Sequence, residues 1–167
     1  CEKVAPHLHL PFQAGNDRVL AAMNRGYTRE HYLGLVRSLR QRIPDIVLTS
    51  DIIVGFPGET EEDYLLTRQA VERVQFDNAF IFRYSPRRGT PAAAMEEQIP
   101  EEVKEARNQD LLAVANEIAI RKNRELVGTV QEVLLEGPSK TNEARLSGRT
   151  SQNKPVMVDA APDLTGE

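Results

Sequence analysis

The sequence predicts an α/β protein in which a parallel sheet covered by helices precedes a small antiparallel β-module. Two observations support this fold class. Strand-like apolar runs alternate with helix-like segments three times between residues 7 and 127, and strands separated by helices pair in parallel. From Gly128 onward, short alternating runs are separated by glycine and proline turns, a pattern typical of antiparallel strands. Three strand–helix units are too few for a closed eight-stranded barrel, so they suit part of a barrel or half of a doubly wound sheet.

The clearest strand–loop–helix unit begins with Val47–Val54, an apolar run whose one charged residue is Asp51. This run is typical of a strand buried on both faces. Gly55–Gly58 ends the strand, because glycine supplies unusual backbone angles and proline fixes a turn position. Thr60 as N-cap, with Asp63 as its capping-box partner, then begins a helix. Ligands bind at the carboxyl ends of parallel strands, so Asp51 is the first candidate for ligand contact. The alternative is that it caps a turn or pairs with an arginine.

The remaining elements follow from apolar spacing and from capping residues. We expect strands at residues 7–11 and 79–84, helices at 17–23, 28–43, 60–74 and 100–127, and an irregular turn at 85–91. On the second and third of these helices, the residues expected to face the core are Tyr32, Leu35, Val36, Leu39, Tyr64, Leu65, Ala70, Val71 and Val74. On the long last helix, we expect the charged residues to be solvated.

Composition excludes several classes of protein. With 40% hydrophobic and 28% charged residues, the 167-residue chain is an ordinary globular sequence with room for one domain and a small appendage. It has no membrane-length apolar run and no N-terminal signal pattern. The single cysteine, Cys1, excludes an internal disulfide and a cysteine-rich metal site, and it fits a reducing, cytoplasmic location. His7 and His9 share one strand face, but without further ligands we expect them to face the core or a substrate rather than a metal.

The net charge of −4 gives no general attraction to nucleic acid, so RNA contact would require a local patch. The candidate patch is in the β-module, whose loops and strand ends carry Lys140, Arg145, Arg149 and Lys154. On one face, these four cations could bind a phosphate backbone. A solvated surface of mixed charge is the alternative, because acidic residues lie between the cations and no aromatic residues are interleaved for base stacking.

Longer motifs extend over essentially the whole chain. In order, they are HLHLPFQAGNDRVLAAMNRGYT, TSDIIVGFPGETEEDY and YSPRRGTPAA. Together they resemble the methylthiotransferases of the radical S-adenosylmethionine (SAM) superfamily. The tail, with LVGTVQEVLLEGPSK and LSGRTSQNKPVMV, resembles the small RNA-binding module called TRAM that ends those enzymes. The segment FDNAFIFRYSPR is most similar to the MiaB branch, which modifies isopentenylated adenosine beside the anticodon of tRNA. The alternatives are another branch, acting on a different tRNA nucleoside or a ribosomal protein, and a non-catalytic RNA-binding fragment.

The resemblance implies the carboxyl-terminal half of a partial (β/α)6 TIM-like radical SAM barrel, with a connecting helix, over residues 1–125. A truncated TRAM-like β-barrel module would follow over residues 126–167. Members of the family hold two 4Fe–4S clusters, one through a CxxxCxxC motif near the first barrel strand and one in an N-terminal domain. This chain has no such motif, and Cys1 has no partner cysteine. The resemblance therefore implies a fragment that is inactive alone, with S-adenosylmethionine, tRNA and the missing N-terminal part as partners.

The resemblance also assigns site residues. Gln13, Arg25 and Asp51 match the positions that hold the ribose and carboxylate of S-adenosylmethionine in related enzymes, and their chemistry suits this role. The alternative for Gln13 is hydrogen bonding to loop backbone, and for Arg25 it is an acidic partner. The implied apolar slot and backbone edge for adenine consist of Ile53, Val54, Gly55, Tyr84 and Ser85. The four module cations would bind tRNA phosphates. In the intact enzyme, the cofactor yields a radical that takes hydrogen from an adenine carbon, and sulfur and a methyl group are then added.

Overall fold

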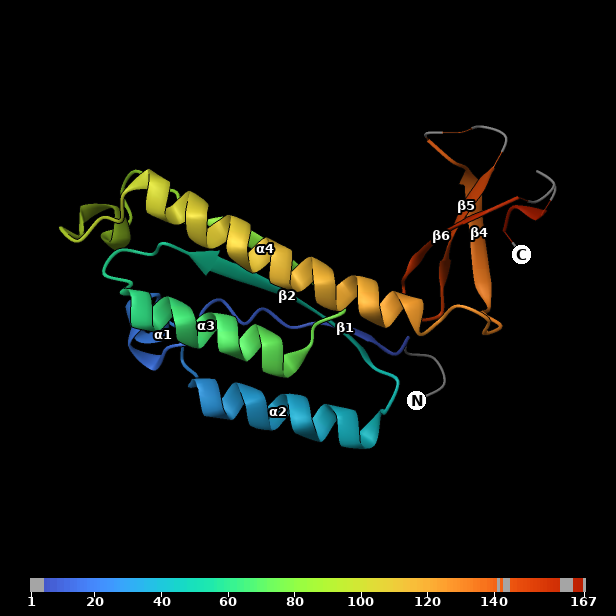
Figure 1. The fold of residues 1–167 in the computed structure, drawn as a ribbon, viewed down its shortest axis with the longest axis horizontal. Coiled ribbons are helices and arrows are strands. Elements are labelled where there is room, and N and C mark those ends of the chain that lie inside the picture. Colours follow the sequence, from blue (N-terminus) through green and yellow to red (C-terminus); the bar gives the residue numbers. More distant parts are fainter. Residues whose placement is uncertain (1–4, 141, 143–144, 160–163, 167) are drawn as a thin grey trace.

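The computed structural model describes residues 5–140, 142, 145–159 and 164–166, and these residues form two sheets. The first sheet is parallel, in the order β1 (His7–His9), β2 (Val47–Val54) and β3 (Asn78–Arg83). The second is antiparallel, in the order β4 (Val133–Pro138), β5 (Leu146–Thr150) and β6 (Pro155–Val158). Figure 1 shows the antiparallel sheet beyond one end of the layer that contains the parallel sheet. The α/β class with both predicted kinds of sheet is confirmed.

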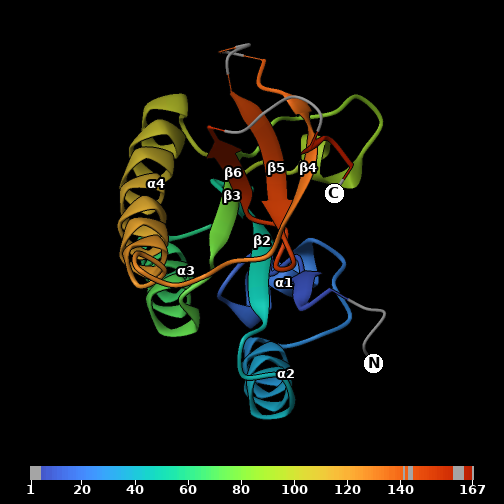
Figure 2. The same cartoon turned by 90° about the vertical axis from the view of Figure 1, so that its right-hand side faces the viewer.

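The helices cover one side of the parallel sheet (Figure 2). They are α1 (Asp17–Ala22), α2 (Arg29–Arg42), α3 (Glu61–Val74) and α4 (Glu101–Arg124). A single 3-10 turn, η1 (Pro91–Ala94), lies in the segment between β3 and α4, beyond the end of the sheet at which β2 finishes (Figure 1). One apolar core joins side chains from α2, α3, α4 and the strands, and a smaller cluster packs α1 against the turn after β2. No helix in the described part of the chain is long and apolar enough to cross a membrane.

The expected start of α3 is present in full. The Thr60 side chain accepts the Asp63 backbone N–H at 3.2 Å, and the Asp63 carboxylate accepts the Thr60 N–H at 2.8 Å. This reciprocal capping box satisfies two backbone donors that a helix start leaves unpaired. The same carboxylate also pairs with Arg18, so α1 is tied to the start of α3.

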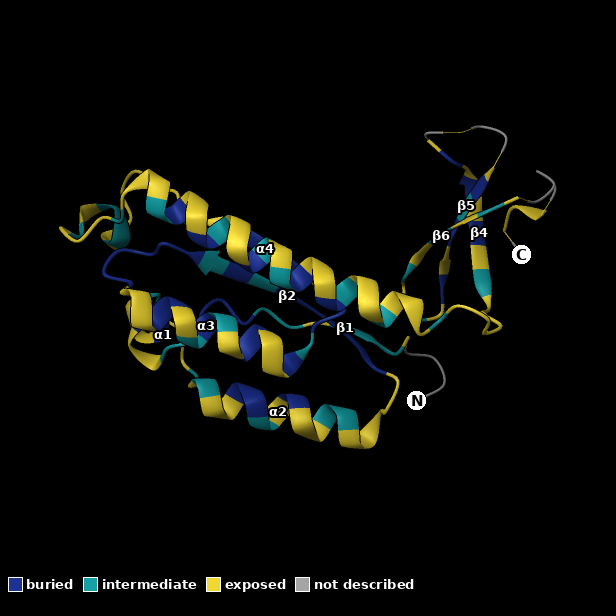
Figure 3. Cartoon of the chain, viewed as in Figure 1, coloured by how far each residue is buried: buried dark blue, intermediate teal, exposed yellow. Residues whose placement is uncertain are grey.

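The two faces of β2 have different surroundings. Leu48, Ile52 and Val54 are fully buried beneath the helices, because alternate side chains of a strand point to the same face. Asp51 and Ile53 point to the opposite face and are partly exposed. Their partners in β3 are Phe80 and Phe82, which are 47% and 51% exposed. We call this second side, where Asp51, Ile53, Phe80 and Phe82 lie, the open face of the parallel sheet. Figure 3 shows β2 in dark blue and teal, the colours of buried and intermediate residues.

Two residues expected in the core are exposed, so that part of the prediction is wrong. Leu35 and Leu65 are 41% and 43% exposed, whereas Leu33 and Thr67 are buried. On α3, Thr67 faces the core in place of Leu65. Its buried hydroxyl has two hydrogen-bond partners: it accepts the Gly15 N–H at 2.8 Å and donates to the Asp63 carbonyl at 3.2 Å. The backbone of Gly15 lies so close to Thr67 that any Cβ would collide with it. This close approach requires glycine.

The expectation that the charged residues of α4 are solvated is also wrong at two positions, Lys104 and Arg107, which are buried. Arg107 donates to a Glu59 carboxylate oxygen at 2.7 Å and to the Glu59 carbonyl at 3.2 Å. The same carboxylate oxygen accepts the Gly55 N–H at 2.9 Å. Burial raises the pKa of Glu59, while the Gly55 hydrogen bond and the Arg107 charge oppose that shift. This buried pair fixes the turn that follows β2 against α4.

Replacing Arg107 with alanine should destabilise the fold strongly, because the Glu59 carboxylate would stay buried without its charge partner. The expected loss is about 3–5 kcal/mol of unfolding free energy. Arg124→Ala, on the exposed end of the same helix, is the control and should cost less than about 0.5 kcal/mol. Urea unfolding followed by circular dichroism measures both. A loss for Arg107→Ala no larger than for the control would contradict the role assigned to the pair.

Candidate functional site

The structure brings Gln13, Asp51 and Ile53 together at the carboxyl ends of β1 and β2. The Gln13 N–H donates to the Asp51 carbonyl at 2.9 Å, and the Gln13 carbonyl accepts the Ile53 N–H at 2.9 Å. Gln13 is 6% exposed and has a φ of 68°, an uncommon value for a residue other than glycine. Such backbone strain recurs at ligand sites. The backbone of Gln13 thus continues the pairing of the first strand with β2 beyond β1.

The Asp51 side chain lies on the open face and contacts His9. One carboxylate oxygen, Oδ2, is 3.3 Å from His9 Nε2, and the other ring nitrogen, Nδ1, is 2.9 Å from the Thr49 hydroxyl. The His9 ring meets Phe80 edge to face, with 6.2 Å between the ring centroids. The side chains of His9 and Asp51 are 40% and 35% exposed, so both can be reached from this face.

The three residues proposed for the adenine slot at the end of β2 differ in accessibility. Ile53 is partly exposed on the open face, whereas the Val54 side chain is fully buried on the helix side. Gly55 has a φ of 72°, and a Cβ there would collide with the Lys104 side chain. Its N–H is already bound to Glu59. In this structure, Ile53 is therefore the one of the three whose side chain faces the open side.

Tyr84 continues β3 beside this turn. Its N–H donates to the Val54 carbonyl at 2.9 Å, and its ring meets Phe56 edge to face at 5.2 Å. The Lys104 ammonium lies 5.8 Å from the centre of the Tyr84 ring, a cation–π distance. The buried Tyr84 hydroxyl has no hydrogen-bond partner among the described residues. Ser85, the next residue, is exposed.

Arg25 lies apart from these residues in the turn after α1. It is exposed, and with Asp17, Tyr27 and His31 it lines a shallow depression of about 420 Å³. Tyr27 connects this turn to the segment that contains Gln13, because its hydroxyl donates to the carbonyl of the preceding residue, Phe12, at 3.1 Å. Asp51 is not among the residues that line this depression.

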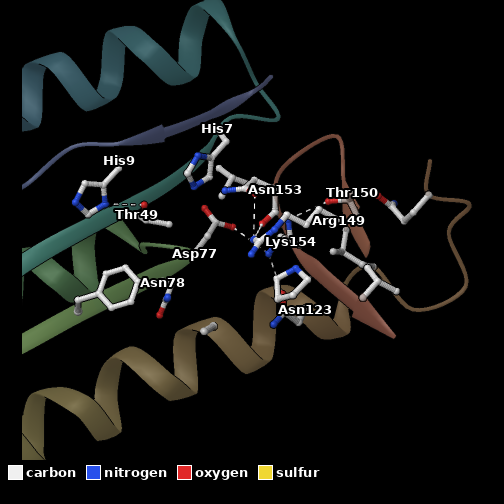
Figure 4. Close-up of a pocket in the computed structure, with 17 residues that line it drawn as sticks. His7, His9, Thr49, Asp77, Asn78, Asn123, Arg149, Thr150, Asn153 and Lys154 are labelled. Atoms are coloured by element: carbon white, nitrogen blue, oxygen red, sulfur yellow. Dashed lines mark hydrogen bonds and ion pairs between the residues drawn. The ribbon is translucent and has the colours of Figure 1, made fainter. Parts of the chain in front are cut away.

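A larger cavity of about 810 Å³ lies between the open face and the antiparallel sheet (Figure 4). The strands of the parallel sheet contribute His7, His9, Asn78 and Phe80, and the β5–β6 region contributes Arg149 and Asn153. The wall combines an exposed aromatic ring, amide groups and a guanidinium. It therefore offers stacking, hydrogen-bonding and anion-binding groups together.

The four predicted RNA-binding cations are not equally available. Lys140 is exposed. Arg145 pairs with Asp159 at 2.7 Å, and the Arg149 guanidinium is 3.5 Å from Glu136. Lys154, whose side chain is 17% exposed, points to the junction with the parallel sheet. No group of three or more His, Cys, Asp or Glu that could hold a metal ion occurs among the described residues.

Comparison with known proteins matches two segments of the chain to families. Residues 2–71 match the model of the radical SAM superfamily, and residues 124–167 match the TRAM domain. Proteins named tRNA-2-methylthio-N(6)-dimethylallyladenosine synthase are similar over nearly all of the chain. That of Akkermansia muciniphila is 79% identical over 99% of this chain and 36% of its own length. Those of Acetivibrio thermocellus and Moorella thermoacetica are each 56% identical, over 100% and 99% of this chain and 35% and 37% of their own lengths.

The resemblance to the radical SAM methylthiotransferases is confirmed. The chain spans about a third of the length of the curated relatives that it matches. Among solved structures, coproporphyrinogen III oxidase (HemN) from Escherichia coli, described as a radical SAM enzyme, has a TM-score of 0.57 with 13% identity. The alignment covers 95% of this chain and 47% of that protein, and at this identity it supports the fold alone.

The radical SAM segment (residues 2–71) and the TRAM segment (residues 124–167) are joined through Asp77, a buried residue that directly precedes β3. Asp77 Oδ2 accepts the Leu48 N–H at 3.0 Å and is 2.7 Å from Lys122 Nζ, while Oδ1 is 3.5 Å from Lys154 Nζ. Lys154 also donates to Asn123 at 2.8 Å. Burial lowers the pKa of Lys122, and the contact with Asp77 opposes the shift. One carboxylate therefore links β2, α4 and the TRAM segment.

Sequence reasoning did not identify Asp77 or Arg107 as important side chains, and it expected His9 to face the core or a substrate without identifying its contact with Asp51. Their partners are distant in the sequence, so no local spacing indicates the contacts. For His9 there was a partial signal, because its spacing of two residues from His7 predicts that both side chains lie on one strand face. Asp77 and Arg107 offered no such signal.

Asp77→Asn should loosen the TRAM segment from the parallel sheet, because asparagine keeps an acceptor for the Leu48 N–H but loses the charge that faces Lys122 and Lys154. We expect hydrogen exchange of the amides at 150–154 to become about tenfold faster, the effect of losing roughly 1.4 kcal/mol. Asp159→Asn removes the exposed partner of Arg145 and is the matched control, with little expected change. Equal exchange in wild type and Asp77→Asn would exclude this anchoring role.

Proposed function

We propose that the chain is the carboxyl-terminal part of a tRNA methylthiotransferase that adds a methylthio group to isopentenylated adenosine beside the anticodon, using radical SAM chemistry. The observation that carries the proposal is an alignment over 99–100% of the chain, at 79% and 56% identity, with proteins named tRNA-2-methylthio-N(6)-dimethylallyladenosine synthase. A cytoplasmic location belongs to the proposal, because the single cysteine of the sequence fits a reducing compartment.

Within this proposal, the parallel sheet and its helices form the second half of a partial (β/α)6 barrel over residues 1–125, and residues 126–167 form the TRAM domain. The open face would then line the barrel interior, where the remaining strands complete the enclosure. The half-exposed Phe80 and Phe82 support this arrangement, since large aromatic side chains on a sheet face usually have a covering layer.

The residues at the carboxyl ends of the strands fit S-adenosylmethionine. The Asp51 carboxylate can accept from ribose hydroxyls, and Gln13 can hold polar groups beside it. Ile53, Tyr84, Ser85 and the backbone of Val54 and Gly55 would flank adenine, and Arg25 would offer two parallel donors to the cofactor carboxylate. When bound, S-adenosylmethionine supplies the radical and the methyl group. The two proposed 4Fe–4S clusters need cysteine ligands, and no described residue is a cysteine.

The tRNA would approach from the TRAM side. Lys140, Arg145, Arg149 and Lys154 are the proposed phosphate contacts, and the cavity between the TRAM segment and the open face offers a place for an extruded base. Base-modifying enzymes take the target base out of its stack, and the exposed Phe80 ring is a suitable stacking surface. Because Lys154 is held by Asn123 and Asp77, it would have to exchange these partners to bind phosphate.

The proposed reaction can be tested by mass spectrometry of tRNA nucleosides. In a strain that lacks the gene encoding this chain, the methylthio form of the isopentenylated adenosine should disappear and its unmodified precursor should accumulate. Restoring the gene should reverse both changes. Loss of a different modified nucleoside would instead favour another branch of the methylthiotransferases, and an unchanged nucleoside profile would contradict the proposal.

The proposed phosphate contacts predict a change in salt dependence. Replacing both Lys140 and Arg149 with alanine in the full-length protein should weaken tRNA binding and reduce the salt slope by about one to two phosphate contacts. Arg37→Ala with Arg73→Ala, which removes two exposed cations from α2 and α3, is the control of equal charge change. Filter binding at several salt concentrations measures the slopes. Equal salt slopes in the two double variants would contradict the proposed phosphate contacts, because the loss of two positive charges anywhere on the protein would then explain the change.

A further inference from the structure

Three side chains on the open face form a continuous polar chain: Thr49, His9 and Asp51. Thr49 and His9 face each other as register partners in β2 and β1, and Asp51 lies two residues further along β2 on the same face. The Thr49 hydroxyl is 2.9 Å from His9 Nδ1, and His9 Nε2 is 3.3 Å from Asp51 Oδ2. Of these three side chains, the resemblance to the methylthiotransferases assigns a role to Asp51 alone, so the part played by His9 requires its own explanation.

The two partners of His9 determine which nitrogen of its ring carries the hydrogen. An ionised carboxylate accepts hydrogen bonds and cannot donate them. At the 3.3 Å separation of His9 Nε2 and Asp51 Oδ2, a hydrogen bond between the two side chains therefore requires the hydrogen to be on Nε2. In the neutral ring, Nδ1 is then an acceptor, and the Thr49 hydroxyl donates to it. The acceptor-only carboxylate therefore sets the ring form, and the Thr49 hydroxyl, which can donate or accept, complements it. The edge of Phe80 against the ring restricts its rotation further.

This contact leaves one oxygen of Asp51 available. Oδ2 forms the ion-pair contact with His9 at 3.3 Å, whereas no hydrogen bond or ion pair from a described residue reaches Oδ1. The backbone around Asp51 is also fixed, because its carbonyl accepts the Gln13 N–H. A carboxylate held through one oxygen loses less rotational freedom when the other binds a ligand, and such preorganisation favours binding.

We propose that His9 is a positioning residue that orients the Asp51 carboxylate to accept from the ribose hydroxyls of S-adenosylmethionine. The proposal rests on the proposed function, since it assumes that Asp51 contacts this cofactor. A partly exposed His–Asp pair contributes little to folding. Its effect should therefore appear in cofactor affinity rather than in stability.

The test compares two substitutions of similar size in the full-length holoenzyme. Glutamine places its side-chain NH₂ near the position of His Nε2, so His9→Gln can still donate to Asp51. Asparagine places its NH₂ near Nδ1, so His9→Asn cannot reach Asp51. His7→Asn, on the same strand and face, is the control. Affinity for S-adenosylmethionine is measured by calorimetric titration, with circular dichroism to verify folding of each variant.

We expect His9→Asn to weaken the affinity about two- to fivefold, the range of an exposed ion pair. His9→Gln should stay close to wild type, and His7→Asn should have no effect. Asp51→Ala should weaken the affinity roughly 5- to 150-fold, as the loss of a charge-assisted hydrogen bond would. In the Asp51→Ala background, the further change His9→Asn should have no effect, because His9 acts only through Asp51.

The possible results separate the two levels of the proposal. If Asp51→Ala leaves affinity unchanged, the assignment of Asp51 in the proposed function fails, and the role of His9 fails with it. If Asp51→Ala weakens binding but His9→Asn does not, the assignment of Asp51 stands and the positioning role is overturned. An equal loss from His9→Asn with and without Asp51, or an equal loss in His9→Gln and His9→Asn, would also overturn it, because either result indicates a general structural effect.

Discussion

The structure depends on the alternation of side chains along β2. As the central strand of the parallel sheet, β2 pairs on both edges, and successive side chains point to opposite faces. Leu48, Ile52 and Val54 therefore enter the core beneath the helices, while Asp51 and Ile53 reach the open face. A shift of one residue in the register would exchange the two sets and place a carboxylate in the core. The same eight residues thus determine both the packing and the candidate site.

The turn after β2 has its conformation fixed by buried charge. Glu59 binds the Gly55 N–H with its carboxylate, and Arg107 from α4 neutralises that carboxylate. The left-handed backbone at Gly55 and the proximity of the Lys104 side chain leave no room for a Cβ. A buried pair of this kind adds little net stability compared with apolar packing, but it fixes one arrangement of the groups that it contacts. Here those groups border the proposed cofactor site.

Charge is used differently in the antiparallel part of the chain. Arg145 and Arg149 have acidic partners within it, whereas Lys154 is directed to Asp77 and Asn123 at the junction. A count of cations in the sequence therefore overstates the positive charge available to a phosphate backbone. A net charge of −4 is compatible with a local RNA-binding surface, because attraction of phosphates depends on the unpaired positive charges of one face.

The sequence by itself determined the order and type of the elements, the turn after β2, the capping box of α3 and the family resemblance. These features depend on residues close together in the chain, such as Thr60 and Asp63. Only the tertiary structure decided that Leu33 and Thr67, rather than Leu35 and Leu65, face the core, because the rotation of a helix depends on the surface against which it packs. The same holds for the contacts of His9 with Asp51, Glu59 with Arg107 and Asp77 with Lys154. Each pair joins different elements, and such residues meet only after the sheet and its helices have assembled, so no spacing in the sequence could predict them.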